Sequence, residues 1–501
     1  MKVKVRSKIL KVMLIVTILA IAISFVACGK KKKDNLNNIG ENLSNYYIDL
    51  EYMLTSQSAV ANCEVDYINN SEAMLKEVKF HLYISSFCKD AKNSPITPTS
   101  SETAYYGEES YASLSISRVQ LNGEDVVPSY EGEDNNILVV NLTSSLYPSE
   151  RVNIKIEYNF SLPHMKHRFG YGENTVNFGN FYPVACAYDN GWKTDPYSAI
   201  GDPFCSDIAN YNVSLSIPSN YTLASTGEFK NSTETDGKGY YNIEAKCVRD
   251  FAFVVSDKFN VATKKYNDVT INYYYTLDNN YEKALKCAYD SIKTFSEQFY
   301  SYPYSTYNVV QADFCYGGME YPNLSLIAND IENYDDYLNV IVHETAHQWW
   351  YSIVGNDEYN EAWLDESLTE FSTVLFYDYN TDYTFNHKQM VDATHENYCL
   401  YQTVYTDVLG SLDSSMNRPN NEFSTEPEYT FNVYAKGVLM FDSLYNLVGK
   451  KNFVKSLQLY AETNAYKIAK SEDLIASFET TCNTNLENFF TCWLDGKVII
   501  H

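Results

Sequence analysis

The chain has 501 residues, of which 38 are Lys or Arg and 64 are Asp or Glu, giving a formal net charge of −26 at pH 7. This acidity argues against a nucleic-acid partner, because phosphates repel a negatively charged surface. Eleven cysteines spread over this length without a C-x-x-C pair exclude a small disulfide-stapled scaffold.

Residues 1–27 have the pattern of a secretory signal peptide. Five basic residues precede an apolar run from Val12 to Ala27. The segment Phe25-Val26-Ala27-Cys28 resembles a bacterial lipobox, which implies that Cys28 is lipidated and becomes the mature N-terminus. An uncleaved membrane anchor is the alternative, although sixteen apolar residues are short for a spanning helix. Both interpretations leave the remaining chain outside the cytoplasmic membrane and attached to it.

Residues 28–47 are predicted to form a polar tether. Lys30–Lys33 are followed by a stretch rich in asparagine, with little apolar material to pack. The lysines are placed to contact anionic lipid headgroups and so to supplement an acyl anchor. A plain solvated linker is the competing interpretation.

Residues 48–262 are predicted to form an antiparallel β-domain. Val152, Ile154 and Ile156 alternate with polar residues, which is the period of a strand with one buried face. Val78 and Phe80 lie in a second segment of the same kind. We therefore expect a sheet-rich first half.

Residues 263–501 are predicted to form a second, mainly helical domain. Leu285, Ala288, Ile292 and Phe295 make one apolar stripe at helical spacing. Further along, Gly317–Pro322 is interpreted as an edge strand that leads into a turn, and its paired glycines allow another backbone to approach closely. A peptide laid along this edge would place a positive group near Glu320.

The segment His343-Glu344-Thr345-Ala346-His347 indicates a metal site. In a helix, residues four apart share one face, so both imidazoles reach a single ion. Eighteen residues separate His347 from Glu366, enough to end this helix and begin an antiparallel one that presents Glu366 as the third ligand. Two histidines and one carboxylate leave the fourth position of Zn²⁺ open, as in catalytic sites. The alternative is an amphipathic helix that contains two histidines by chance.

Two further residues are candidates for this site. Glu370, one turn after Glu366, is predicted to accept the free ring N–H of a ligand histidine. Tyr434, in Tyr434-Ala435-Lys436-Gly437, would be an oxyanion donor if it lies near the metal, since a phenol donates a hydrogen bond without adding charge.

These motifs together resemble the aminopeptidase N family of gluzincin zinc metallopeptidases. That family combines H-E-x-x-H and a glutamate eighteen residues later with an upstream G-x-M-E-N segment and a downstream Y-x-K-G. Tyr321 stands where the family usually has Asn. The resemblance implies an α+β multidomain fold, in which a saddle-like antiparallel β-domain precedes a thermolysin-like, mainly helical catalytic domain. The large helical C-terminal domain of many members is expected to be missing, because the sequence ends at His501.

The resemblance also assigns roles to residues of this sequence. It implies one zinc ion per chain, bound by His343, His347 and Glu366, with Glu344 as the general base and Tyr434 as the oxyanion stabiliser. Gly317, Gly318, Met319 and Glu320 would bind the substrate, with Glu320 anchoring its α-amine.

The expected function is a membrane-anchored extracellular aminopeptidase that acts on peptides with a free N-terminus. Two alternatives remain open. The same zinc site occurs in gluzincin endopeptidases, and a surface lipoprotein with this fold would also serve as a peptide-binding protein without catalysis.

Overall fold

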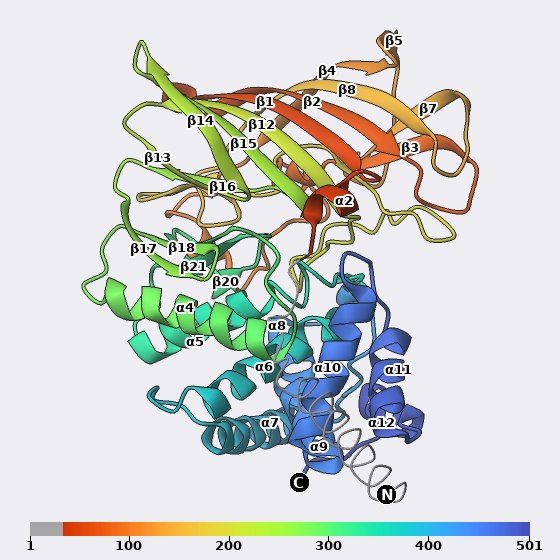
Figure 1. The fold of residues 1–501 in the computed structure, drawn as a ribbon, viewed down its shortest axis with the longest axis vertical. Helices are drawn as coiled ribbons and strands as arrows, with labels where there is room; N and C mark the ends of the chain where they lie inside the picture. The colour runs from red at the N-terminus through yellow and green to blue at the C-terminus, as the bar shows by residue number, and fades with distance from the viewer. Residues whose placement is uncertain (1–33) are drawn as a thin grey trace, which may run out of the picture. The chain divides into compact units, whose positions relative to one another are not determined.

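An eight-stranded sheet forms the upper layer of the first half of the chain (Figure 1). The computed structural model describes residues 34–501. The strands of this sheet are β1 (Ser44–Met53), β2 (Ser58–Ile68), β4 (Ser113–Leu121), β5 (Glu124–Val126), β8 (Arg151–Ser161), β12 (Ala209–Pro218), β14 (Glu228–Thr235) and β15 (Lys238–Val248). Their order is β14-β15-β12-β1-β2-β8-β4-β5.

The burial of this sheet follows the predicted alternation. In β8, Val152, Ile154 and Ile156 are buried, while the residues between them are partly exposed. All neighbouring strands in the sheet are antiparallel except β1 and β12, which run parallel. The predicted β-rich first half is thus confirmed, and its sheet is mixed at one pair.

Two smaller four-stranded sheets complete the first half. One contains β9 (Phe169–Tyr171), β10 (Val176–Phe178), β13 (Thr222–Ser225) and β16 (Phe253–Ser256), and the other contains β3 (Leu75–His81), β6 (Ser129–Glu131), β7 (Ile137–Leu146) and β11 (Val184–Ala185). The short helix α2 (Leu36–Gly40) precedes β1, and the helical turns η1 (Leu54–Ser56), η2 (Tyr83–Phe87) and α3 (Ser101–Ala104) lie between later strands. From β10, the Asn177 amide donates to the carbonyl oxygen of Asp313 at 2.9 Å, which fixes the small sheet to the chain just before the glycine segment.

The second half begins with a five-stranded sheet. Its strands are β17 (Asn260–Tyr266), β18 (Val269–Tyr275), β19 (Thr306–Ala312), β20 (Gly318–Met319) and β21 (Leu324–Ala328). The order β17-β18-β19-β21-β20 leaves β20 at one edge, as the glycine segment predicted.

Helices make up the remainder of the second half, at the bottom of Figure 1. They are α4 (Tyr281–Gln298), α5 (Tyr334–Ala346), η3 (Ala362–Leu364), α6 (Glu366–Tyr379), α7 (His387–Leu409), η4 (Asn420–Glu422), α8 (Glu426–Tyr429), the π-helix η5 (Thr430–Ala435), α9 (Lys436–Val448), α10 (Lys450–Asn464), α11 (Ser471–Cys482) and α12 (Glu487–Leu494). The predicted stripe of α4 is buried, including Ile292 and Phe295. Among these helices, none combines the length and apolar character needed to cross a bilayer.

A buried arginine joins the two halves. Arg249, in the loop after β15, donates to the carbonyl oxygens of Ser206 (3.0 Å), Tyr351 (2.6 Å) and Lys467. Gly355 makes room for it, because a Cβ at that position would lie 2.2 Å from the Arg249 guanidinium carbon. A continuous hydrophobic core also includes residues of both halves, from Tyr46 to Leu494.

Two strands extend across the predicted domain boundaries. The tether was expected to extend to residue 47, but Asn35 caps the helix α2 and Ser44 begins β1. Tyr46 explains the difference, because its side chain is buried and its hydroxyl accepts a hydrogen bond from the Ala185 N–H at 2.9 Å. The boundary expected between residues 262 and 263 falls inside β17, which pairs along its length with β18 of the second half. Residues 1–33, including Cys28, lie outside the described part of the chain.

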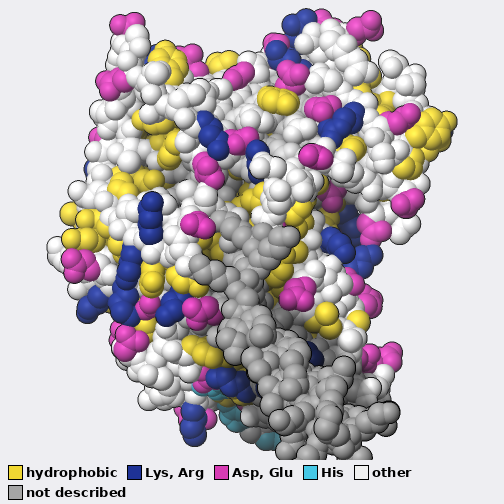
Figure 2. Space-filling view, viewed as in Figure 1, with side chains coloured by type: hydrophobic (Ala, Val, Ile, Leu, Met, Phe, Trp, Pro, Cys, Tyr) yellow, Lys and Arg dark blue, Asp and Glu magenta, His cyan; other side chains and the backbone are white. Residues whose placement is uncertain are grey.

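The acidic side chains do not gather in one place on the face drawn in Figure 2. Aspartate and glutamate are interspersed with lysine and arginine over both halves. The net charge is therefore spread over the visible surface, as is usual for charge that serves solvation.

Candidate metal centre and substrate cavity

Helix α5 brings His343 and His347 to a common point. The helix begins at an Asn333 cap, whose side chain accepts the Asp335 N–H at 2.9 Å, and His347 caps its other end. One helical turn separates the two imidazoles, and their Nε2 atoms are 3.1 Å apart.

Glu366 completes a triangle of metal-binding atoms. It is the first residue of α6, and its Oε2 lies 3.4 Å from Nε2 of His343 and 3.2 Å from Nε2 of His347. A tetrahedral ion with bonds of about 2.0–2.1 Å holds its ligand atoms about 3.3 Å apart. The three donor atoms therefore fit a zinc-sized ion, and the nitrogen and oxygen donor set favours zinc over harder cations.

Hydrogen bonds on the far side of each ring direct the Nε2 lone pairs inward. Nδ1 of His347 donates to the carbonyl oxygen of Trp350 at 3.0 Å, which requires the proton on Nδ1 because a carbonyl only accepts. Nδ1 of His343 lies 2.7 Å from Oε2 of Glu370, the contact expected for that carboxylate. Both histidines are thus oriented as neutral ligands toward the centre of the triangle.

Glu344 lies beside the triangle with one free oxygen. Its carboxylate is buried, and Oε2 has no hydrogen-bond partner in the described structure. Burial raises the pKa of Glu344 to about 7, a value suited to taking up and releasing a proton. Gly318 of β20 makes this placement possible, because a Cβ there would lie 2.3 Å from Oε1 of Glu344.

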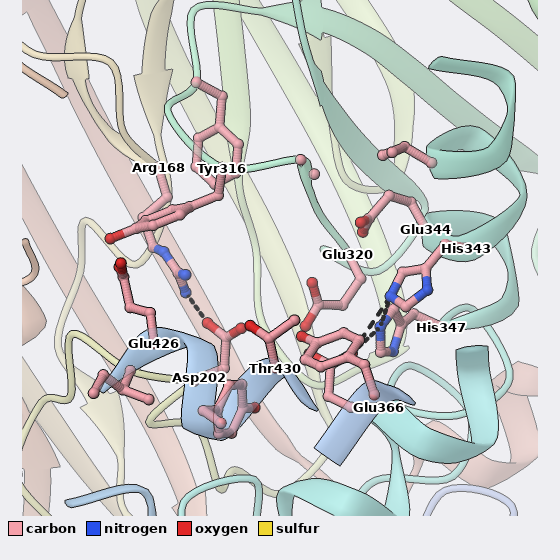
Figure 3. Close-up of a pocket in the computed structure, with 18 of the residues that line it drawn as sticks. Arg168, Asp202, Tyr316, Glu320, His343, Glu344, His347, Glu366, Glu426 and Thr430 are labelled. Atoms are coloured by element: carbon pink, nitrogen blue, oxygen red, sulfur yellow. Dashed lines mark hydrogen bonds and ion pairs between the residues drawn. The ribbon is translucent and has the colours of Figure 1, made fainter. Parts of the chain in front are cut away.

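Glu320 follows β20 and faces the same space (Figure 3). Its side chain is buried and its Oε1 has no hydrogen-bond partner within the described residues. Burial, followed by the charge of Asp202, raises the pKa of Glu320 well above its usual range. A buried carboxyl without a partner is costly, so this position favours a ligand that donates hydrogen bonds and carries positive charge.

Tyr321, which departs from the family pattern, points away from the metal triangle. Its hydroxyl donates to Oδ1 of Asn180 at 2.9 Å in the first half of the chain. The Tyr321 carbonyl accepts from the Gln348 side chain at 3.1 Å, so the helix end next to His347 holds the turn after Glu320. Tyr321 therefore contributes to the packing between the two halves of the chain.

The π-helix η5 carries Tyr434 to the triangle. The Tyr434 ring stacks over His343 with ring centroids 6.0 Å apart, and burial together with the charge of Glu366 raises the pKa of Tyr434 well above its usual range. Gly437 lets α9 pack tightly on α6, because a Cβ there would lie 2.3 Å from the hydroxyl of Ser367. Lys436 is buried and donates to the Trp493 carbonyl at 3.0 Å, which ties this segment to α12.

One cavity of about 470 Å³ is lined by the three metal-binding residues and by Glu320, Glu344, Glu370 and Tyr434. Its other end is formed by residues that the sequence motifs did not indicate: Arg168, Asp202, Tyr316, Glu426, Tyr429 and Thr430. In Figure 3 the Arg168 guanidinium and the Asp202 carboxylate are joined by an ion pair, on the opposite side of the cavity from His343. Residues from both halves therefore build the cavity.

Comparisons with known proteins agree with this geometry. The family model described as the peptidase family M1 domain matches residues 283–493. Aminopeptidase N from Haemophilus influenzae is 29% identical over 252 residues, covering 47% of this chain and 28% of that protein. Leucine aminopeptidase 2 from Emericella nidulans is 32% identical over 200 residues, covering 37% of this chain and 30% of that protein. The matched part thus spans less than a third of each of these curated relatives.

The fold extends the likeness to nearly the whole chain. The crystal structure of an M1 zinc metallopeptidase from Deinococcus radiodurans superposes with a TM-score of 0.63 at 16% identity, covering 91% of this chain and 94% of that one. The predicted arrangement of a β-rich half followed by a helical half is therefore confirmed.

Proposed function

We propose that this chain is a zinc metallopeptidase of the aminopeptidase N family and that it removes the N-terminal residue from peptides; the matches to the peptidase family M1 domain and to aminopeptidases N support this proposal. The observation that carries the proposal is the position of Glu320. A buried carboxyl without a partner lines the same cavity as the metal triangle, where it would bind the α-amine of a peptide.

His343, His347 and Glu366 would hold one zinc ion. When bound, zinc supplies a Lewis acid that polarises the carbonyl group and lowers the pKa of a water molecule. Glu344 would take a proton from the attacking water through its free Oε2 and pass it to the departing amine. The Tyr434 hydroxyl would stabilise the negative charge that develops on the carbonyl oxygen.

Glu320 makes the exopeptidase proposal testable. We expect N-acetylation of a peptide to abolish its cleavage, because an amide nitrogen carries no positive charge to pair with Glu320. Replacing Glu320 by Gln should lower kcat/KM for free peptides by roughly 10–100-fold, the value of a hydrogen bond to a charged group. Both effects are measured by chromatography of the products.

The control is Glu332→Gln, which makes the same chemical change at an exposed position and should leave activity unchanged. Equal cleavage of the free and acetylated peptides would favour an endopeptidase. Peptide binding by the zinc-loaded protein without any product would favour a binding protein.

The proposed location is the outer face of the cytoplasmic membrane, with Cys28 carrying the lipid. The basic and apolar leader and the lipobox-like segment before Cys28 support it. Expressed in its native type of host, the Cys28→Ser variant should lose incorporation of labelled fatty acid and leave the membrane fraction. Unchanged labelling and fractionation would contradict lipidation at this residue.

A further inference from the structure

The end of the cavity opposite the metal triangle contains one cation whose charge is already paired. Arg168 donates to Oδ1 of Asp202, and its guanidinium lies 5.1 Å from the centroid of the Phe204 ring. Its side chain is 7% exposed. Arg168 therefore contributes little free positive charge to a ligand in the cavity.

Glu426 at the same end carries a charge that no cation balances. Its carboxylate accepts hydrogen bonds from the hydroxyls of Ser100 (2.7 Å), Thr97 (2.9 Å) and Thr99 (2.8 Å). These donors fix its position but are neutral, and none of the ion pairs found among residues 34–501 includes Glu426. A carboxylate has about four acceptor positions, so three hydroxyls leave room for one more donor.

Two tyrosine rings line the cavity together with Glu426, and one of them has a hydroxyl group without a hydrogen-bond partner in the described structure. Tyr316 and Tyr429 both line the cavity. The Tyr429 hydroxyl is buried without a hydrogen-bond partner in the described structure, and burial raises the pKa of Tyr429 well above its usual range, so it stays neutral. Aromatic faces attract cations and also pack against the methylene groups of lysine and arginine.

We propose that this cavity selects a basic N-terminal residue, whose guanidinium or ammonium group binds Glu426 beside the Tyr316 and Tyr429 rings. The inference rests on the proposed function, because the α-amine at Glu320 fixes which side chain enters. In Figure 3, Glu426 and Tyr316 lie on the side of the cavity opposite Glu344 and His343, with Glu320 between the two groups. The side chain of the N-terminal residue would extend from Glu320 toward Glu426 within this cavity.

Other side chains fit this end less well. An acidic residue would meet the charges of Glu426 and Asp202, which together exceed the single charge of Arg168. A short or branched aliphatic residue would leave Glu426 and the Tyr429 hydroxyl without a donor. A site built around polar groups discriminates strongly against ligands that leave those groups unpaired.

The test compares fluorogenic aminoacyl amides of arginine and citrulline on the zinc-loaded enzyme. Citrulline has nearly the same shape as arginine but no charge. We expect kcat/KM for the arginine amide to exceed that for the citrulline amide by at least about 10-fold, as expected for a charge-assisted hydrogen bond. Lysine amide should rank above leucine amide, and glutamate amide should be the poorest substrate.

Glu426→Gln should lower kcat/KM for the arginine amide by roughly 10–100-fold and change that for citrulline by less than about 3-fold. The Gln side chain keeps the shape, and the three hydroxyls can rotate to match it, so the melting temperature should be nearly unchanged. Glu422→Gln, an exposed carboxylate four residues earlier, is the matched control and should keep the arginine preference.

The outcomes separate this inference from the proposed function. Hydrolysis of citrulline or leucine amide at or above the arginine rate, or an equal loss for every substrate in Glu426→Gln, overturns the preference while aminopeptidase activity stands. Failure to hydrolyse any aminoacyl amide overturns the proposed function itself.

Discussion

The Glu344→Gln variant is expected to keep its zinc while kcat/KM for aminoacyl amides falls by roughly 10²–10⁴-fold, the usual contribution of a general base. Glutamine has the same shape as glutamate but cannot accept a proton, so activity should fall. Zinc should stay bound because its ligands are His343, His347 and Glu366, and Glu344 is not among them. Metal analysis and steady-state kinetics on the same preparation measure both quantities.

Two further variants define this result. Glu297→Gln, the same change on the exposed face of α4, should have normal activity. Tyr434→Phe should lower kcat by roughly 10²–10³-fold with little change in zinc content, because it removes one oxyanion donor. Full activity in Glu344→Gln would rule out Glu344 as the base.

The His347→Ala variant should lose both zinc and activity. His347 contributes one of three donor atoms that lie 3.1–3.4 Å apart, and two remaining ligands cannot hold the ion at neutral pH. Loss of a residue that only hydrogen-bonds a ligand typically weakens metal binding roughly 10–100-fold, and we expect a loss of zinc affinity of that size in Glu370→Gln. His347 is itself a ligand, so His347→Ala should lower zinc affinity by more than about 100-fold. Competition with a fluorescent zinc chelator measures the affinities.

The matched control is His387→Ala on α7. This histidine forms ion pairs with Asp378 (3.3 Å) and Asp442 (2.7 Å) away from the cavity, and its removal should leave zinc binding intact. Chelator treatment should inactivate the unaltered enzyme, and added zinc should restore it. Unchanged zinc affinity in His347→Ala would mean that the metal binds elsewhere.

The parts of the site that the sequence indicated are those set by local geometry. The spacing of His343 and His347 needs only one helical turn, and Glu366 needs only a second helix that packs against the first. Gly318 lies on a short edge strand and Glu320 directly follows it, in a segment whose glycines are visible in the sequence. These residues meet in the structure because each motif is built within one or two neighbouring elements.

The far end of the cavity was not predictable in this way. Arg168 and Asp202 come from loops of the first half, and Glu426 comes from the start of α8, so only the tertiary fold brings them together. Each is an isolated charged residue in a chain with 102 charged side chains, and no spacing marks it. The strand that begins at Ser44 was missed for a similar reason, because residues 28–47 are mostly polar and Tyr46 makes its hydrogen bond with Ala185, far along the chain.

The π-helix before α9 makes the position of Tyr434 depend on chain length as well as on residue type. Six residues, Thr430–Ala435, adopt the wider turn that presents Tyr434 to Glu366. Each residue of an α-helix rotates the chain by about 100°, so removing one residue from this turn would carry the phenol away from the triangle. A single-codon deletion could thus silence catalysis while every recognisable motif residue survives, and a homologue's activity is better judged from the register of this turn than from its motifs alone.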